Sequence, residues 1–105
     1  AGKCMASYLT MTAAHVNNVF IAAASRIGEE RDARYLGCSL IAGTNGWPIG
    51  KVASANRQEI LFADIDLTSA RSAPIWNSLN DLHRDRRDDL YDQMLGYCQH
   101  PALPR

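Results

Sequence analysis

The chain has 105 residues, 47% of them hydrophobic, and its 11 basic residues balance its 11 acidic ones, so its formal net charge is zero. This length suits one compact domain or one part of a larger domain. A neutral chain has no overall field to hold nucleic acid or an anionic membrane, and no apolar run approaches the roughly 20 residues of a membrane span. The three cysteines lie far apart and are odd in number. They predict no disulfide framework and favour a reducing, cytoplasmic location.

The N-terminal part of the sequence predicts a helix followed by a strand and a polar loop. Apolar residues recur every three or four positions, which gives the helix one apolar stripe. The stripe consists of Met5, Tyr8, Leu9, Thr12, Ala13 and Val16. Asn17-Asn18 ends the helix, because Asn tolerates the left-handed cap conformation. The unbroken apolar run over 19–24 predicts a strand covered on both faces, and the charged stretch 26–34 predicts a loop.

Three further apolar runs predict strands over 35–42, 47–53 and 60–66. Asn45-Gly46, between the first two runs, predicts a hairpin with a type I′ turn, which needs positive φ at both central residues. Pro48 has no backbone N–H, so the strand that contains it should begin at an edge or a bulge.

The rest of the chain predicts a short helix and a tail. Asp66 offers a side-chain cap to a helix over 67–72, and Pro74 ends that helix. The order of elements predicts an α/β (α+β) fold: an N-terminal helix, about four strands, a short helix and an extended tail. We divide the chain into a layered part over 1–73 and a tail over 74–105.

No self-sufficient active site follows from the sequence. A phosphate loop ending at Lys51 fails, because Asn45 stands where the motif needs Gly and Val52 where it needs Ser or Thr. Cys38 lacks the Gly-x-Ser-x-Gly context of a nucleophile elbow, and its apolar surroundings favour a buried, inert thiol. Cys98 and His100 form a close pair, but the second pair of a structural zinc site is missing. We therefore assign no catalytic, cofactor-binding or metal-binding residue to this chain and expect no cofactor.

Read in order, five segments resemble the nitrilase superfamily of carbon–nitrogen hydrolases. Asn17 to Gly28 is similar to its Asn, apolar run, Asn-Arg-x-Gly segment, with Ser25 in place of the second Asn. Three further segments resemble its aromatic-x-Gly-x-Ser-x-Ile strand, the turn that follows it and its last core strand. They are Tyr35 to Ile41, Thr44 to Gly46 and Glu59 to Leu67. The stretch 86–91 resembles its Arg-Arg-x-x-Leu-Tyr tail, so the similarity covers about residues 5 to 91.

The resemblance also implies an absence. Members of the superfamily use a Glu, a Lys and a Cys, and all three precede the region matched here. Cys4 does not qualify, because Met5-Ala6-Ser7-Tyr8 follows it instead of an acid and a proline. A thiolate nucleophile, a carboxylate proton shuttle and a cation for the oxyanion are all required. The chain thus resembles the C-terminal part of such an enzyme without its triad, and alone it should be inactive.

In the superfamily's four-layer αββα sandwich, this part implies strands of one sheet, a covering helix and a tail that crosses to a partner. We expect a homo-oligomer, or an association with the missing N-terminal part of the same hydrolase. The expected interface residues are Trp76, Arg86, Arg87, Leu90 and Tyr91, since Trp, Tyr and Arg are favoured at interface centres. Two alternatives stay open: residues 74–95 cover the chain's own core, or the chain is a standalone interaction module without chemistry.

Overall fold

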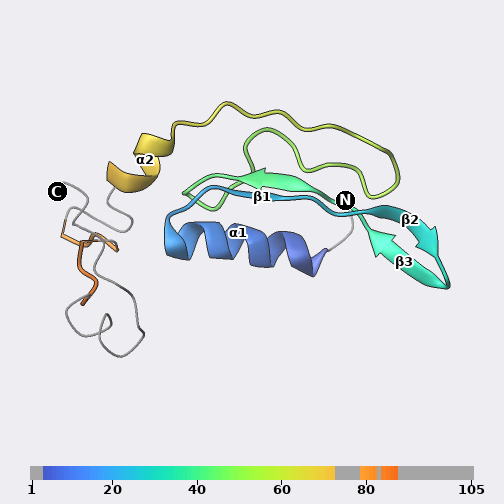
Figure 1. The fold of residues 1–105 in the computed structure, drawn as a ribbon, viewed down its shortest axis with the longest axis horizontal. Helices are drawn as coiled ribbons and strands as arrows, with labels where there is room; N and C mark the ends of the chain where they lie inside the picture. Colours follow the sequence, from blue (N-terminus) through green and yellow to red (C-terminus); the bar gives the residue numbers. More distant parts are fainter. Residues whose placement is uncertain (1–3, 73–78, 83, 88–105) are drawn as a thin grey trace, which may run out of the picture.

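The computed structural model describes residues 4–72, 79–82 and 84–87 and has an α+β fold (Figure 1). Its elements are α1 (Met5–Asn17), β1 (Ile21–Ala23), β2 (Ile27–Glu30), β3 (Ala33–Leu36), β4 (Leu40–Ala42) and α2 (Leu67–Ser72). The strands form two antiparallel pairs, β1 with β4 and β2 with β3. The predicted α+β fold, with an N-terminal helix, strands and a short second helix, is therefore confirmed. Most of the predicted tail lies outside the described residues.

The end of α1 is fixed by Asn18, as the sequence predicts. Asn18 has a left-handed φ of 51°, and its backbone N–H donates to the carbonyls of Ala14 and His15. Its side-chain Nδ2 also donates to the carbonyl of Ala70 in α2, at 2.7 Å. The Asn18 side chain is buried, and its hydrogen bond to Ala70 satisfies its amide donor. Asn18 therefore ends the first helix through its backbone and links it to the second helix through its side chain.

The core lies between α1 and the β1–β4 pair. Ala14, Leu40 and Ala42 are fully buried there, and Met11, Ile21 and Val52 pack against them. The register pairs Ile21 with Ala42 and Ala23 with Leu40, which puts these four side chains on one face of the sheet. Figure 1 shows α1 running along this sheet.

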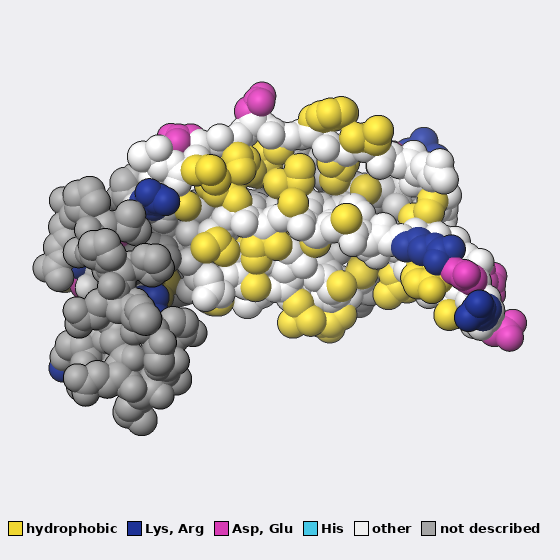
Figure 2. All heavy atoms as spheres, in the orientation of Figure 1, with side chains coloured by type: hydrophobic (Ala, Val, Ile, Leu, Met, Phe, Trp, Pro, Cys, Tyr) yellow, Lys and Arg dark blue, Asp and Glu magenta, His cyan; other side chains and the backbone are white. Residues whose placement is uncertain are grey.

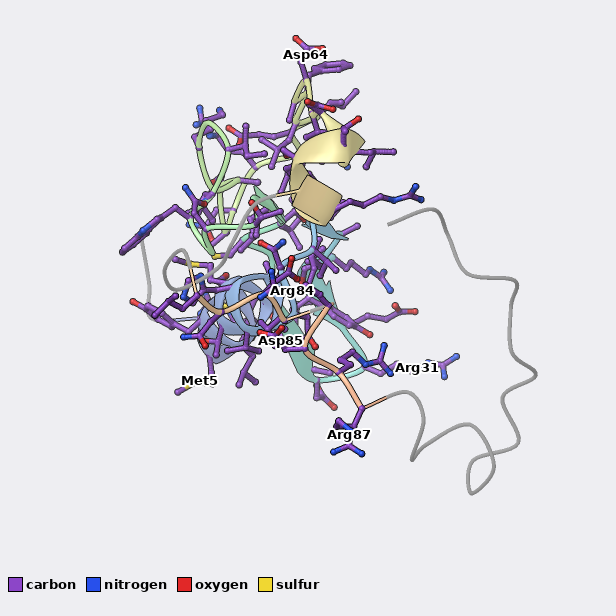
Figure 3. All side chains as sticks on the ribbon, turned by 90° about the vertical axis from the view of Figure 1, so that its left-hand side faces the viewer. Met5, Arg31, Asp64, Arg84, Asp85 and Arg87 are labelled. Carbon is purple, nitrogen blue, oxygen red and sulfur yellow. The ribbon has the colours of Figure 1, made fainter. Side chains whose placement is uncertain are left out.

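The helix packs through a different face from its apolar stripe. The residues toward the sheet are Cys4, Ser7, Met11 and Ala14, whose spacing of three or four also follows the helical period. Ser7 and Ala14 are small, so they let the helix backbone approach the strands closely. The stripe members Met5, Tyr8, Leu9 and Val16 remain exposed. Figure 3 shows Met5 on the outer side of α1.

The prediction that the strand over 19–24 is covered on both faces is wrong. Only its three central residues form β1, and Ala22, on the face away from α1, is exposed. The opposite residue Ile41 shares that face and is only half-buried. One face of the sheet thus carries the core, and the other stays open within the part of the chain that the structure describes.

The expected loop over 26–34 is instead a hairpin. β2 and β3 pair from Ile27 with Leu36 to Glu30 with Ala33. The two-residue turn between them is Arg31-Asp32, and both have positive φ, 49° and 66°, as a type I′ turn requires. The hairpin is exposed along most of its length, so it lacks the apolar alternation by which a strand is read from sequence.

The Asn45-Gly46 turn forms differently from the prediction. Gly46 N–H donates to the carbonyl of Gly43 at 2.9 Å, which makes Thr44 and Asn45 the central residues of the turn. Only Gly46 has positive φ, at 84°. A turn followed by one left-handed glycine is the three-residue loop type, so the chain still reverses here but without a type I′ turn.

The two predicted strands beyond this turn are not formed as such. The chain over 47–53 runs beside β4. The Ile49 N–H donates to the Ile41 carbonyl at 2.7 Å, and the Ala53 N–H donates to the Ser39 carbonyl at 2.8 Å. Among the described residues this segment forms only one isolated bridge, between Ala42 and Pro48, and no continuous strand. The chain over 60–66 forms no ladder, because no described strand lies beside it to accept its hydrogen bonds.

The predicted strand over 35–42 is broken in its middle. Gly37 and Cys38 both have positive φ, at 62° and 59°, and they turn the chain between β3 and β4.

Among the described residues, no helix is long and apolar enough to cross a bilayer.

Hydrophobic side chains remain at the surface of this fold. Figure 2 shows them both where Figure 1 draws α1, below the strands, and where it draws the segment that leads to α2, above them. Ile60 and Phe62 are 79% and 87% exposed, which is unusual for two large apolar side chains at alternate positions of one segment. The fold therefore exposes two apolar surfaces, the outer stripe of α1 and the segment over 60–66.

Candidate functional site

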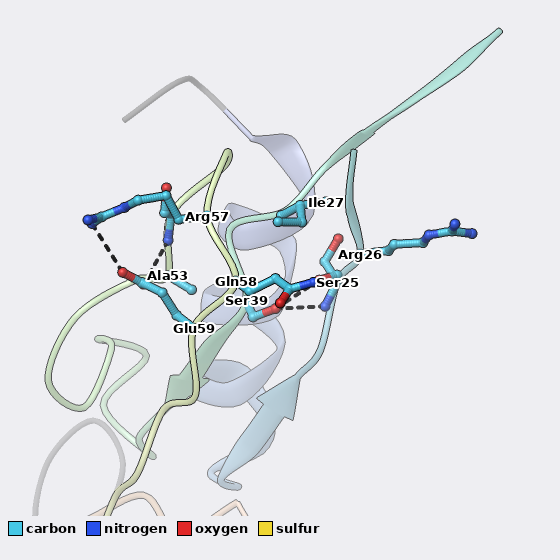
Figure 4. A pocket seen from close by; sticks show the side chains of 9 residues that line it. Ser25, Arg26, Ile27, Ser39, Ala53, Arg57, Gln58 and Glu59 are labelled. Atoms are coloured by element: carbon cyan, nitrogen blue, oxygen red, sulfur yellow. Dashed lines mark hydrogen bonds and ion pairs between the residues drawn. The ribbon is translucent and has the colours of Figure 1, made fainter. Parts of the chain in front are cut away.

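A polar pocket of about 230 Å³ lies where the β1–β2 junction, the β3–β4 turn and the segment over 53–59 meet (Figure 4). It is lined by Ser25, Arg26, Ile27, Ser39, Ala53, Ser54, Arg57, Gln58 and Glu59. An adjoining hollow shares Arg57 and Glu59 and extends to Lys51 and Cys38. The polar side chains of these two hollows make several hydrogen bonds to one another and to the backbone.

Ser39 joins two sides of the pocket. Its Oγ accepts a hydrogen bond from the Ser25 N–H at 2.8 Å and donates to the Ser25 carbonyl at 3.1 Å. Both backbone groups of Ser25 are thereby satisfied just after β1 ends. The hydroxyl acts as a clamp between two chain segments and has no base beside it among these contacts.

Glu59 is the best-bound charged group of the pocket. Its Oε2 accepts from the Ser54 N–H at 3.0 Å, and its Oε1 accepts from Lys51 Nζ at 3.1 Å and from Arg57 at 3.2 Å. The Ser54 N–H and then the Lys51 ammonium hold the pKa of the Glu59 carboxyl below its ordinary value, against the opposing effect of burial. The carboxylate is therefore ionised at neutral pH.

The hollow beside Lys51 brings together Cys38, Lys51 and Glu59, the residue types of the triad that the resemblance implies. Their contacts do not fit that chemistry. A carboxylate with a lowered pKa and three donors is a weak proton acceptor. Cys38 is buried, and its backbone N–H donates to the Ser54 carbonyl at 3.5 Å. We assign the cluster to holding the segment over 51–59 against the sheet.

The expected interface residues are only partly described. Arg86 and Arg87 are exposed, whereas Trp76, Leu90 and Tyr91 lie outside the described residues. Figure 3 shows Arg87 extending away from the body. An interface at these positions stays a prediction.

The charged stretch next to these residues forms a local ion pair. Arg84 Nε lies 2.9 Å from Asp85 Oδ1, and Asp85 N–H donates to the Asp81 carbonyl at 2.9 Å. The Arg84 backbone N–H also donates to Asp81 Oδ1 at 3.0 Å. These contacts close a compact turn of alternating charge.

No three His, Cys, Asp or Glu side chains gather at metal-binding distances in the described ranges. The Cys98 and His100 pair lies outside them. The sequence analysis missed the Lys51–Glu59–Arg57 cluster, because Lys51 was weighed only as part of a phosphate loop. The eight-residue separation of Lys51 and Glu59 carries no motif that would have revealed it.

Comparison with known proteins shows a similarity to a nitrilase. A nitrilase from Pyrococcus abyssi (strain GE5 / Orsay) is 40% identical to the chain over 75 residues, which are 71% of this chain. Over this stretch the chain is related to the nitrilases. The matched residues make up only 28% of that relative, so the chain spans little more than a quarter of it. No family model matches the chain.

The Glu59 contacts predict a pH-dependent contribution to stability. Glu59→Gln should destabilise the fold at neutral pH, because Gln keeps the shape but loses the charge that Lys51 and Arg57 face. A lowered folded-state pKa stabilises the fold above the unfolded-state pKa of about 4.3, and this stabilisation is lost as the pH falls through the folded-state value.

Urea titrations at pH 7 and at about pH 3 measure this effect. The difference between the two proteins should be present at pH 7 and shrink toward pH 3. Asp64→Asn, at an exposed carboxylate that Figure 3 shows pointing away from the body, is the matched control and should have little effect at either pH. An equal effect of Glu59→Gln at both values of pH would contradict the assignment.

Proposed function

We propose that the chain is the C-terminal part of a carbon–nitrogen hydrolase, in which it supplies scaffold and subunit contacts. The complete enzyme would act on non-peptide C–N bonds of small amides, carbamoyl compounds or nitriles. The observation that carries the proposal is the 40% identity to a nitrilase over most of the chain. We place the protein in the reducing cytoplasm, which the free Cys4 and Cys38 thiols support.

The open surfaces of the fold support a role as one part of a larger sandwich. The sheet face with Ala22 and Ile41 is uncovered, and a second sheet packed about 10 Å away would bury it. The segment with Ile60 and Phe62 has large exposed side chains and no strand partner among the described residues. Both features would be satisfied in a four-layer αββα arrangement with the rest of the polypeptide.

The reaction of the complete enzyme follows from its chemistry. A cysteine thiolate would attack the carbon of the amide or nitrile, and a carboxylate would move the proton that the leaving nitrogen needs. A lysine ammonium would stabilise the developing negative charge. Within the described residues, the Cys38, Lys51 and Glu59 side chains do not have the contacts for these roles, so we propose that the triad lies outside this chain and that the chain alone is inactive.

Ammonia release tests the proposal. The complete gene product, incubated with a panel of small amides, N-carbamoyl compounds and nitriles, should release ammonia above the uncatalysed rate. The 105-residue chain at equal concentration should release none above buffer. Turnover by the chain alone that disappears in Cys38→Ser would contradict the proposal and would assign the hollow beside Lys51 as an active site.

The second candidate function is a standalone module that homo-oligomerises and has no chemistry. The exposed stripe of α1 favours it, because Met5, Tyr8 and Leu9 form an apolar surface that a second copy could cover. The properties of the complete gene product distinguish the two candidate functions. A product that carries no triad, releases no ammonia and forms a discrete oligomer, as measured by size-exclusion chromatography with light scattering, would favour the standalone module.

A further inference from the structure

The turn that contains Asn45 and Gly46 is closed by hydrogen bonds from the backbone and from a side chain. The Gly46 N–H donates to the Gly43 carbonyl at 2.9 Å, and the Gly43 N–H donates to the Trp47 carbonyl at 2.9 Å. The Asn45 side chain takes part through Oδ1, which accepts from the Trp47 N–H at 3.0 Å. The Asn45 carboxamide is therefore part of the turn, although Asn45 is exposed to solvent.

Gly46 is packed against α1. It is buried, and an added Cβ at this position would lie 2.9 Å from His15 Cβ and 3.0 Å from the Met11 carbonyl oxygen. The second of these atoms belongs to the helix backbone, so a change of side-chain rotamer cannot move it aside. The main chain at Gly46 has no room for an additional carbon atom on the side toward the helix.

An asparagine followed by glycine carries a reaction of its own. The backbone nitrogen of the glycine can attack the Cγ of the asparagine side chain, since glycine has no side chain to hinder the approach. The new C–N bond closes a five-membered succinimide ring, and the carboxamide C–N bond breaks. Ammonia leaves, with its third hydrogen taken from the glycine N–H. Water then opens the ring at either carbonyl and leaves aspartate or isoaspartate at the asparagine position.

The folded turn opposes this reaction. Ring closure requires the Asn45 Cγ to lie in the plane of the peptide bond between Asn45 and Gly46. Asn45 is the second central residue of the turn, and in the type I turn on which such loops are built this residue has a ψ of about 0°. The backbone nitrogen of Asn45 then lies in that plane and its side chain lies out of it. The Trp47 N–H and the Gly43 carbonyl hold the two reacting residues in this geometry.

We propose that Asn45 is a deamidation site that the folded turn protects, and that isoaspartate, once formed in an opened turn, prevents the turn from closing again. Isoaspartate places an extra methylene in the main chain before Gly46, where the contacts with His15 and Met11 leave no room. The turn joins β4 to the segment over 47–53, so its loss would loosen that segment from the sheet. The proposal concerns the chain itself and does not rest on the hydrolase function.

Peptide mapping measures the protection. The full chain is incubated at neutral pH and digested with trypsin, which yields peptide 35–51 with Asn45 as its only asparagine. Conversion replaces the carboxamide NH2 with OH, and mass spectrometry detects the gain in mass. A sample digested before the incubation gives the background. The reference is the isolated peptide 35–51 incubated in the same way.

Asn45 in the full chain should convert at least about tenfold more slowly than in the isolated peptide, because only the opened fraction of the folded chain reacts. Equal rates in the chain and in the peptide would overturn the proposal.

Gly43→Ala should remove part of the protection locally. An added Cβ at Gly43 would lie 3.2 Å from Asn45 Oδ1, so the carboxamide must move from its place in the turn. Conversion should become about threefold to tenfold faster, as expected for the loss of one hydrogen bond. Gly50→Ala is the matched control, because an added Cβ there meets nothing within 4 Å, and its rate should stay unchanged. No increase in Gly43→Ala, or an equal increase in both variants, would overturn the proposal.

The two products test the effect on the turn. Aspartate at position 45 keeps the length of the main chain and an oxygen for the Trp47 N–H, so Asn45→Asp should unfold at the same urea concentration as the unsubstituted chain. The isoaspartate form, separated by chromatography, should unfold at a lower urea concentration. Equal urea midpoints for the isoaspartate form and Asn45→Asp would contradict the claim that isoaspartate keeps the turn open.

Discussion

Leu40→Ala is expected to lower the free energy of unfolding by about 2–5 kcal/mol, which is the range for truncating a large side chain in a packed core. Leu40 is the largest fully buried side chain among the described residues, at 1% exposure, and it contacts the α1 side of the core. Its loss leaves a cavity between helix and sheet that Ala14 and Ala42 are too small to fill.

Urea denaturation followed by far-ultraviolet circular dichroism measures this effect. The matched control is Leu36→Ala, because Leu36 is also in a strand but is 58% exposed, and its truncation should change stability by only about 0.5 kcal/mol. Similar losses for Leu40→Ala and Leu36→Ala would contradict the placement of the core against β4.

Gly37→Ala should destabilise the chain by about 2–4 kcal/mol, through a strained backbone and a steric clash together. Gly37 has a φ of 62°, and an added Cβ would lie 2.7 Å from Ile27 Cγ2 and 2.9 Å from the Ser54 carbonyl oxygen. Because the second contact is with backbone, a change of side-chain rotamer cannot relieve it.

Gly50→Ala is the control that separates the two effects. Gly50 also has a positive φ, at 77°, but an added Cβ would meet nothing within 4 Å. Its replacement should therefore carry the backbone strain alone, about 1 kcal/mol. The same denaturation measurement applies, and equal losses at positions 37 and 50 would show that the close packing around Gly37 has no energetic weight.

The sequence predicted where the helices begin and end better than which of their side chains are buried. Asn18 and Asp66 were recognisable because capping acts locally: Asn18 adopts the left-handed cap, and Asp66 Oδ1 accepts from the Thr68 N–H at 2.9 Å. The choice of helix face was not local. The helix buries Ala14 and turns Ser7 and Met11 toward the sheet, while most of the larger residues of its apolar stripe stay exposed. Which face is buried therefore depends on the sheet that packs against the helix.

The strand predictions failed where pairing decided the outcome. The hairpin of β2 and β3 was missed because its side chains are mostly exposed, so its pattern resembles a polar loop. It is held instead by pairs such as Arg26 with Glu30 and by Arg26 stacked 4.7 Å above the Tyr35 ring. The segment over 60–66 has the composition of a strand, but no strand among the described residues pairs with it. Composition indicates that a segment can form a strand and does not indicate which segment pairs with it.

The candidate site was the least predictable part of the chain. Glu59 takes its position from the backbone N–H of Ser54 and from Lys51, and neither contact leaves a sequence signal. Cys38 reaches the hollow beside Lys51 through the left-handed turn at Gly37 and Cys38, which the sequence analysis interpreted as a continuous strand.

The coding sequence upstream of Ala1 tests most directly whether this chain is part of a carbon–nitrogen hydrolase. We predict an in-frame extension that encodes a Glu, a Lys and then a Cys in a Cys-x-Asp/Glu-x-x-Phe/Tyr-Pro-Glu context, all in the same polypeptide. A start codon immediately before Ala1, with no such residues encoded in frame, would contradict the account. The relationship to nitrilases would then describe ancestry alone.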